Sequence, residues 1–254
     1  MVDPRAARDC SGLLVQGAQR TLIDAPPELR LQLVREGVSG VEQVLLTHEH
    51  FDHVGGLPQL EFYVRYGTRR PLPVYAGAEA IAAVKQQYAF MLDTLELRPI
   101  KAFETVSLDG VNYTALPAAH SKGSFGYLIE VPGQVPQNPP WELGEGQVGE
   151  TRMYRYAYFP DTGPPLPETL ERLEGLDVFI VDSTFSGTNW SPKTHHSIDE
   201  AIALAQRLQP RQTYLTHLAM HFDEPITLAQ LEQRLPHCTC PITIAHDGLT
   251  IPLG

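Results

Sequence analysis

Residues 45–56 read "LLTHEHFDHVGG" and hold three histidines and one aspartate within six positions, directly after an apolar run that predicts a strand. These residues are His48, His50, Asp52 and His53. Crowded imidazoles repel one another when they are protonated, so the cluster has no advantage as a bare surface. A cation between the side chains explains the pattern, because imidazole nitrogens and carboxylate oxygens are common metal ligands. We therefore interpret the segment as a metal-binding motif.

Further candidate ligands follow other strand-like runs. His120 comes shortly after "YTAL", Asp161 ends "YAYFPD", and His217 ends "TYLTH". Sites in α/β sheets are built where a rigid strand passes into a loop, so we expect these side chains to lie beside the histidine cluster. Asp182 ends "FIVD" and His195 precedes a predicted helix. For Asp182 the sequence leaves two roles open, a direct part in the chemistry or support of a neighbouring side chain.

The chemistry of this set suits two divalent ions. The predicted ligands are His48, His50 and His120 for one ion, Asp52, His53 and His217 for the other, and Asp161 as the bridge. Manganese and zinc are the expected ions, and nickel is a further candidate. Such a pair lowers the pKa of bound water and attracts anionic esters, so we expect hydrolysis through a metal-bridging hydroxide. Asp24, in "TLIDA", is the expected partner for the second nitrogen of a ligand imidazole.

Composition limits the other functions. The chain has 254 residues, which we take as a single domain, 1–254, and 43% of them are hydrophobic. No apolar run reaches the roughly 18 residues of a membrane span, and we expect no secretory leader. Three cysteines, Cys10, Cys238 and Cys240, favour a reducing cytoplasm and predict no disulfide framework. The net charge of −11 makes a nucleic-acid partner unfavourable.

Strand-like and helical patterns alternate along the chain and predict an α/β (α+β) layered domain. Residues 12–25 predict a hairpin, and residues 197–208 predict an amphipathic helix with Ser197 as its N-cap. Residues 78–95 have helical spacing, and residues 242–253 predict two closing strands. The Pro- and Gly-rich stretch 132–151 predicts a loop insertion.

The segment "THEHFDH" resembles the signature of the metallo-β-lactamase superfamily of dinuclear hydrolases. That resemblance implies a four-layer αββα sandwich with the metals at one edge, between the sheets. "CSGLLV", "LPAAHSKGSFGYLIE", "YFPDTG" and "YLTHLAMHFD" resemble the phosphodiesterases of bacterial phosphonate breakdown, which open a phosphoribosyl cyclic phosphate. In that family a histidine before the "IDEAIALA"-type helix acts near the leaving group. It corresponds here to His195 or to the adjacent His196, and we assign His195 and Asp52 to the catalytic set.

Two features depart from that family. Its members usually carry a cysteine cluster that holds a structural zinc; here the cysteines are absent, although His221 resembles the remaining ligand. The insertion 132–151 lies where tRNA 3′-processing endonucleases of the same superfamily carry an RNA-binding arm. This one contains Glu142, Glu145 and Glu150 and no lysine or arginine, whereas a phosphate-binding arm needs cations.

We therefore predict a metal-dependent phosphodiesterase acting on a small cyclic or alkyl phosphate diester. The alternatives are an RNA phosphodiesterase of the tRNA-processing type, a lactone or thioester hydrolase, and a non-catalytic metal-binding accessory protein. The accessory role is disfavoured because all seven ligand positions are filled. The sequence is compatible with a homodimer.

Overall fold

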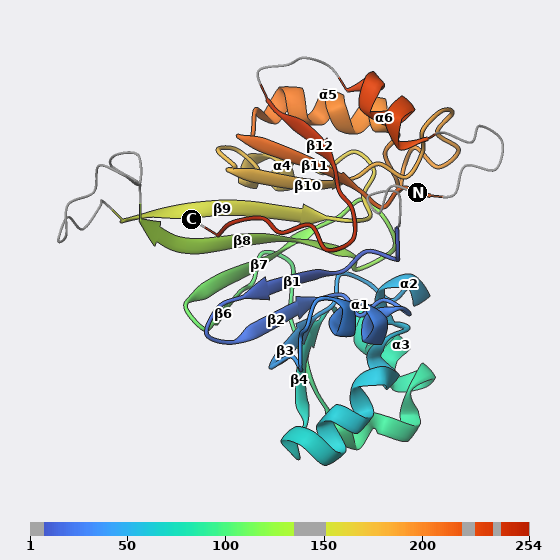
Figure 1. Cartoon of the computed structure of the whole chain (residues 1–254), viewed down its shortest axis with the longest axis vertical. Helices are drawn as coiled ribbons and strands as arrows, with labels where there is room; N and C mark the ends of the chain where they lie inside the picture. The colour runs from blue at the N-terminus through green and yellow to red at the C-terminus, as the bar shows by residue number, and fades with distance from the viewer. Residues whose placement is uncertain (1–7, 135–150, 220–226, 236–239, 254) are drawn as a thin grey trace.

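A computed structural model of the chain describes residues 8–134, 151–219, 227–235 and 240–253. Two mixed sheets form its centre (Figure 1). The first sheet has the order β1 (Leu13–Gln16), β2 (Arg20–Ile23), β3 (Gln43–Leu45), β4 (Leu72–Ala76) and β5 (Leu95–Pro99). The second has the order β12 (Ile242–Ile244), β11 (Gln212–Thr216), β10 (Val178–Asp182), β9 (Thr151–Phe159), β8 (Phe125–Gln134), β7 (Val111–Pro117) and β6 (Thr105–Leu108).

Helices cover the outer face of each sheet. The first sheet is flanked by α1 (Leu29–Arg35), α2 (Phe51–Val54), η2 (Leu57–Leu60), the π-helix η3 (Tyr63–Thr68), α3 (Ala78–Gln87) and η4 (Ala89–Thr94). The second is flanked by α4 (Pro167–Arg172), α5 (Ile198–Leu208) and α6 (Leu228–Arg234). The predicted four-layer αββα sandwich is therefore confirmed (Figure 1).

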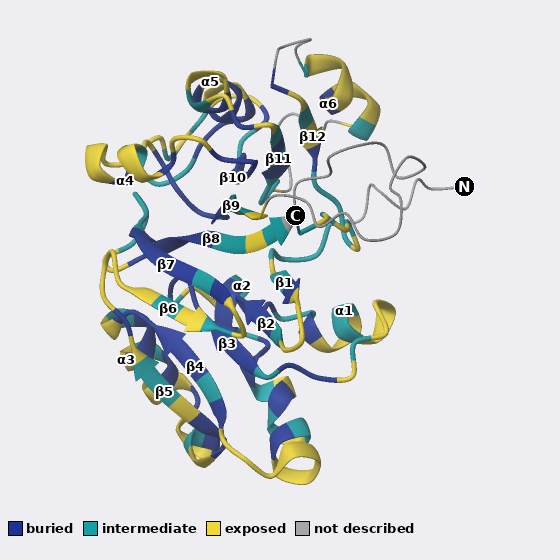
Figure 2. Cartoon of the chain, turned by 90° about the vertical axis from the view of Figure 1, so that its left-hand side faces the viewer, coloured by how far each residue is buried: buried dark blue, intermediate teal, exposed yellow. Residues whose placement is uncertain are grey.

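Three hydrophobic clusters hold the layers together. The central cluster lies between the sheets and includes the buried side chains of Leu45, Tyr113 and Tyr127. The two outer clusters join each sheet to its own helices, through Val84 on one side and Ile202 on the other. Figure 2 shows that buried residues concentrate on the strands, apart from β5 and β6, and that exposed residues lie mainly on the helices and the connecting segments. Burial on both faces explains why β4 and β10 are almost continuously apolar.

Most neighbouring strands around the metal-binding motif are parallel. β2, β3, β4 and β5 run in one direction, as do β9, β10, β11 and β12. Parallel strands bring their carboxyl ends to the same edge of a sheet, so residues distant in sequence meet there. The fold thus gathers the loops that follow β3, β9, β10 and β11.

The helix that follows the His195 loop begins as predicted. Ser197 accepts a hydrogen bond from the backbone nitrogen of Glu200 at 3.3 Å, and the Glu200 carboxylate accepts one from the Ser197 nitrogen at 2.7 Å. This capping box satisfies two amide groups at the start of α5. Ile198 and Ile202 then bury the apolar side of the helix against the second sheet. The cap therefore fixes where the preceding loop ends.

Several predicted boundaries are wrong. Residues 132–134 and Thr151, predicted as loop, belong to β8 and β9, because the two strands pair through to Gln134 and Thr151; residues 135–150 lie outside the described residues. The helical pattern of 78–95 divides into α3, η4 and the start of β5. In 242–253 only β12 is a strand, and a turn follows at 247–248. The second predicted strand is absent from this range, where the Pro252 backbone oxygen accepts a hydrogen bond from the Tyr156 hydroxyl.

Other predictions concern residues beyond the described ranges. His221, which resembles a ligand of the family's structural zinc, and Cys238 lie outside the described residues. Cys240 is buried and its sulfur lies 3.3 Å from the Thr213 hydroxyl. No helix among the described residues combines the length and apolar character that crossing a membrane requires.

Candidate metal centre

The predicted ligands come together at the edge where the strands end. His48 follows β3, His120 follows β7, Asp161 follows β9 and His217 follows β11. His50 is the N-cap of α2, a single turn that directs Asp52 and His53 back toward His48. The ring centres of His48 and His53 are 4.3 Å apart.

A glycine allows this turn to pack closely on the loop after β2. A Cβ at Gly56 would lie 2.1 Å from the backbone oxygen of Pro26, so no larger residue fits without a shift. The Gly56 nitrogen donates to the oxygen of Ala25 at 2.7 Å. The contact holds the motif beside Asp24, the first residue after β2.

Asp24 and Thr47 orient the first histidines. Asp24 is fully buried, and its carboxylate lies 2.8 Å from Nδ1 of His53. The Thr47 hydroxyl donates to Asp24 at 2.9 Å, so its oxygen accepts from Nδ1 of His48, which is also 2.9 Å away. Both imidazoles therefore carry their proton on Nδ1 toward the protein, and Nε2 is left for a ligand.

The second sheet repeats this arrangement. The Thr184 hydroxyl donates to Asp182 at 2.6 Å and lies 2.9 Å from Nδ1 of His217. Nδ1 of His120 donates to the backbone oxygen of Thr194 at 2.9 Å. His217 adopts a left-handed backbone conformation with φ of 57°, as Asp24 does with φ of 64°. Left-handed non-glycine residues are strained and concentrate at functional sites.

The free nitrogens converge on Asp161. Its Oδ2 lies 2.7 Å from Nε2 of His53, and its Oδ1 lies 3.3 Å from Nε2 of His217. Nε2 of His120 and Nδ1 of His50 are 3.1 Å apart. The structure brings together both predicted sets, each with ligand atoms within 4.8 Å of one another: His48, His50 and His120, and Asp52, His53 and His217. Metal ligation by these residues stays a prediction.

The electrostatics of the cluster favour metal binding. Burial lowers the pKa of His48 to about 2, so this imidazole is neutral, as a ligand must be. Burial opposes the charge on Asp161, but His217 and His53 outweigh it and hold the carboxyl pKa well below its usual range. Burial likewise opposes the charge on His53, yet Asp24 and Asp161 raise its pKa well above the ordinary value. A cation at this position would displace that proton.

Three buried polar atoms without a hydrogen-bond partner in the described part of the chain show whether the residues of the cluster fit a metal. Nε2 of His48, Nε2 of His53 and Oδ2 of Asp161 make no hydrogen bond to any described residue. His53 and Asp161 approach closely without hydrogen-bond geometry, as two ligands of one ion do. An unsatisfied buried polar atom is costly, and a divalent ion would satisfy all three. The residues present therefore fit the predicted metals.

His195 lies at the rim of the cluster. Its Nδ1 is 2.8 Å from Asp182, and its ring centre is 4.7 Å from that of His120 and 5.6 Å from that of His217. The side chain is 17% exposed, so it is partly accessible to solvent. His196 is buried and belongs to none of the clusters that could hold a metal among the described residues.

Sequence reasoning missed two features of the site. Thr184 links His217 to Asp182, and His195 joins Asp161 and Asp182 in further clusters that could hold an ion. The spacing of Asp182 and Thr184 was a usable signal, because an aspartate often accepts hydrogen bonds from the residue two positions later. The contact with His217, 33 residues away, had no local signal.

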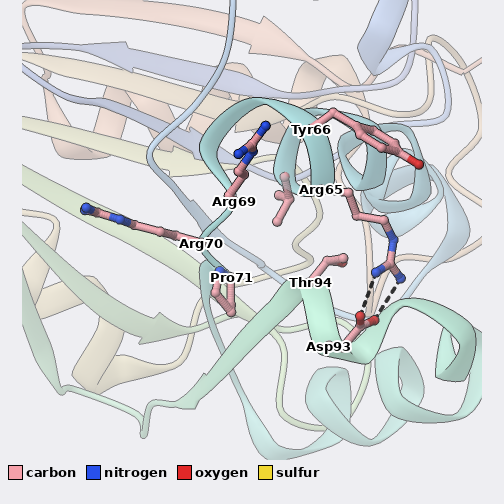
Figure 3. Close-up of a pocket in the computed structure, with 8 residues that line it drawn as sticks. Arg65, Tyr66, Arg69, Arg70, Pro71, Asp93 and Thr94 are labelled. Atoms are coloured by element: carbon pink, nitrogen blue, oxygen red, sulfur yellow. Dashed lines mark hydrogen bonds and ion pairs between the residues drawn. The ribbon is translucent and has the colours of Figure 1, made fainter.

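A surface hollow of about 350 Å³ lies away from these residues, between η3 and η4 (Figure 3). Arg65, which lines it, is paired with Asp93 at 2.6 Å and with Glu61 at 2.8 Å. Arg70 extends away from Arg65 in the picture. No residue of the histidine cluster lines this hollow, so we place the chemistry at the strand ends.

Asp24→Asn is expected to weaken metal binding about 10- to 100-fold, the usual cost of losing a carboxylate that orients a ligand histidine. Asparagine tolerates the left-handed backbone of this position, so the substitution removes the carboxylate charge and leaves the loop conformation unchanged. Calorimetric titration of the metal-free protein measures the effect. Asp109→Asn, at an exposed left-handed aspartate, is the matched control. Equal metal affinity in the Asp24 variant and the wild type would show that Asp24 does not support a ligand.

Known proteins resemble the chain over most of its length. Residues 19–218 match the beta-lactamase superfamily domain. The crystal structure of a diphosphatase from the PhnP family is 25% identical with a TM-score of 0.77, covering 98% of this chain and 85% of that one. Ribonuclease Z of Archaeoglobus fulgidus is 24% identical over 260 residues, which cover 87% of this chain and 85% of the relative.

An octanoyltransferase of Porphyromonas gingivalis is 26% identical over 250 residues; the match covers 93% of this chain and 43% of that protein, so the chain spans less than half of this relative. The domain match covers most of the chain and includes the whole histidine and aspartate cluster. The chain belongs to the metallo-β-lactamase superfamily and is a metal-dependent hydrolase of that fold.

Proposed function

We propose that the chain is a phosphodiesterase that hydrolyses small cyclic or alkyl phosphate diesters at a centre of two divalent ions. The observation that carries the proposal is the position of Asp161. It shares one cluster with His48 and His53 and another with His120 and His195, so it touches members of both predicted ligand sets. A carboxylate with two inward-facing oxygens suits a bridging role.

The bound ions would supply Lewis acidity, which lowers the pKa of water toward neutrality and offsets the charge of a phosphate. Histidines His48, His50 and His120 would hold one ion. Asp52, His53 and His217 would hold the other, and the mixed nitrogen and oxygen set suits zinc or manganese, with nickel a further candidate. Asp52 is assigned to the catalytic set as a predicted ligand whose side chain is 38% exposed and therefore accessible to solvent.

His195 is proposed to give a proton to the departing oxygen. Asp182 holds its Nδ1, and the backbone nitrogen of Thr162 donates to the same carboxylate at 3.0 Å, so the pair is fixed. Nε2 of His195 is then the nitrogen available to a substrate. A sugar or alkyl oxygen leaves as a strong base unless it is protonated, and histidine is suited to that role near neutral pH. Burial of His196 favours His195 over its neighbour.

Three findings favour a phosphate substrate over a lactone or thioester. The similar solved structure is named a diphosphatase, and the curated relative Ribonuclease Z is named for cleavage of a nucleic acid. The segment "HSKGSFGYLIE" resembles the cyclic-phosphate phosphodiesterases.

The proposal is tested by offering the metal-loaded protein three substrates: bis-p-nitrophenyl phosphate, a lactone and a precursor tRNA. We expect hydrolysis of the phosphate diester well above that of the lactone. A lactone hydrolysed faster than any diester would contradict the proposal.

An RNA phosphodiesterase is the second candidate, because Ribonuclease Z of A. fulgidus covers most of this chain. The acidic insertion between β8 and β9 and the net charge of −11 oppose it, since counterion release drives most binding to RNA. We therefore rank it below a small-molecule substrate.

Replacing residues 135–150 with Asn-Gly tests the insertion. Gln134 pairs with Thr151, so a two-residue turn can close the hairpin. We expect metal content and hydrolysis of bis-p-nitrophenyl phosphate to stay within about tenfold of the wild type, because the described ligands lie outside this segment. Filter binding with precursor tRNA at two salt concentrations is the second measurement. Tight, salt-sensitive tRNA binding that disappears in the shortened protein would contradict our interpretation of the insertion.

A further inference from the structure

The loop that carries His195 also carries an exposed tryptophan. Trp190 is 66% exposed, although tryptophan is usually largely buried. Its ring centre lies 6.0 Å from that of Phe185, and the Phe185 ring centre lies 6.2 Å from that of His195. One aromatic ring thus separates Trp190 from the residue proposed to serve the leaving group.

Hydrogen bonds fix the backbone around this tryptophan. The Asn189 side-chain nitrogen donates to the backbone oxygen of His195 at 2.9 Å and to Glu200 at 2.6 Å. Its side-chain oxygen accepts from the Ser191 nitrogen at 2.9 Å. The residues on both sides of Trp190 are therefore anchored to His195 and to the first turn of α5. A ligand that contacts the indole does not need to order the loop.

An exposed, preordered indole is suited to binding a flat ring. Aromatic side chains stack on nucleobases of any identity, because every base has a π-face, and this contact needs no cation. In a nucleotide the ribose separates the phosphate from the base. In the protein the Phe185 ring lies between the rings of His195 and Trp190, so aromatic side chains lead from the rim of the histidine cluster to the indole. A nucleotide bound with its phosphate at the cluster could extend its base along these side chains.

We propose that Trp190 is a stacking platform for the base of a nucleotide phosphodiester whose phosphate is bound at the metal centre. The inference rests on the proposed function and narrows its substrate class to nucleoside cyclic phosphates and related nucleotide diesters. Trp190 then determines specificity and takes no part in the bond-breaking step.

A matched pair of substrates tests this role. Adenosine 2′,3′-cyclic phosphate and methyl riboside 2,3-cyclic phosphate share the sugar and the cyclic diester, and only the first has a base. We expect Trp190→Ala to lower kcat/KM for the adenosine compound about 5- to 100-fold, the usual cost of losing one stacked base, mainly through KM. The methyl riboside should be hydrolysed as by the wild type. Trp190→Phe should restore most of the loss.

Tyr66→Ala is the control for losing an exposed aromatic. Tyr66 is 70% exposed but packs against Phe62 beside the arginine-lined hollow. It should leave both substrates unchanged. An equal loss on both substrates in Trp190→Ala, or no loss on either, would overturn the proposal.

A binding measurement separates this proposal from the proposed function. The chain has two tryptophans. The difference in fluorescence between the wild type and Trp190→Phe therefore gives the signal of Trp190. Adenosine monophosphate should quench the metal-loaded wild type, ribose 5-phosphate should not, and the variant should lose the quenching. If neither cyclic phosphate is hydrolysed, the proposed function fails, and this titration still decides on stacking. Equal quenching of the wild type and Trp190→Phe by adenosine monophosphate would contradict the proposal that Trp190 stacks on the base.

Discussion

Asp161→Ala is expected to lower kcat/KM for bis-p-nitrophenyl phosphate about 10³-fold or more. Asp161 is buried, and both of its oxygens face imidazole nitrogens of the cluster, at 2.7 Å from His53 and 3.3 Å from His217. Removing it takes away the residue proposed to touch both ions, and leaves His53 and His217 with Asp52 as the carboxylate that faces their Nε2 atoms, at 3.2 Å from each. Metal ions contribute several kcal/mol of charge stabilisation in such reactions, and each 1.36 kcal/mol is a factor of ten.

Asp177→Asn is the matched control for this variant. Asp177 is also a buried aspartate of the second sheet, but it lies at the opposite end of β10 and pairs with Arg152. Its replacement should reduce stability while leaving activity per folded molecule close to that of the wild type. Equal activity losses in the two variants would mean that Asp161 acts through folding alone.

His195→Ala is expected to produce a loss that depends on the leaving group. General-acid help is typically worth about 10²–10⁴-fold, so hydrolysis of a cyclic ribose phosphate or a methyl ester should fall by that amount. Hydrolysis of bis-p-nitrophenyl phosphate should fall far less, because p-nitrophenolate leaves without a proton. Steady-state rates on both substrates, from the same metal-loaded preparation, measure the difference.

Metal content and a neighbouring variant complete this test. His195 shares clusters with Asp161 and Asp182, so loss of metal in His195→Ala would identify it as a ligand. Equal losses on both substrates with full metal content would identify a binding or structural role. His196→Ala should lack the leaving-group dependence, and its presence there would assign the proton donor to His196.

The metal-binding motif and the ends of the strands were predictable because their signals are local. A histidine cluster after an apolar run, and a histidine or aspartate at or just after the end of four later strands, β7, β9, β10 and β11, are visible in single segments of sequence. Parallel strand order then makes those ends meet. Ser197 is a similar case, because a capping box depends on residues three positions apart.

The remaining features depend on contacts between distant segments. The difference in burial between His195 and His196 arises where the chain between Phe185 and Ser197 folds back, with the Phe185 nitrogen donating to the His196 oxygen at 3.3 Å. Adjacent histidines of identical chemistry give no sign of this in sequence. The ends of the 132–151 segment were also wrong, because pairing between β8 and β9 extends strands into a stretch whose composition predicts a loop.

The metal content of the reconstituted protein tests the central claim most directly. Wild type and Asp161→Ala are incubated with Mn²⁺ or Zn²⁺, freed of loose metal and measured side by side by elemental analysis, and a wild-type crystal is measured by anomalous diffraction. We expect two ions per wild-type chain, roughly 3.5–4 Å apart as in other two-metal sites, and loss of most metal in the variant. A wild-type content that stays at one ion or below with either metal would contradict the dinuclear centre.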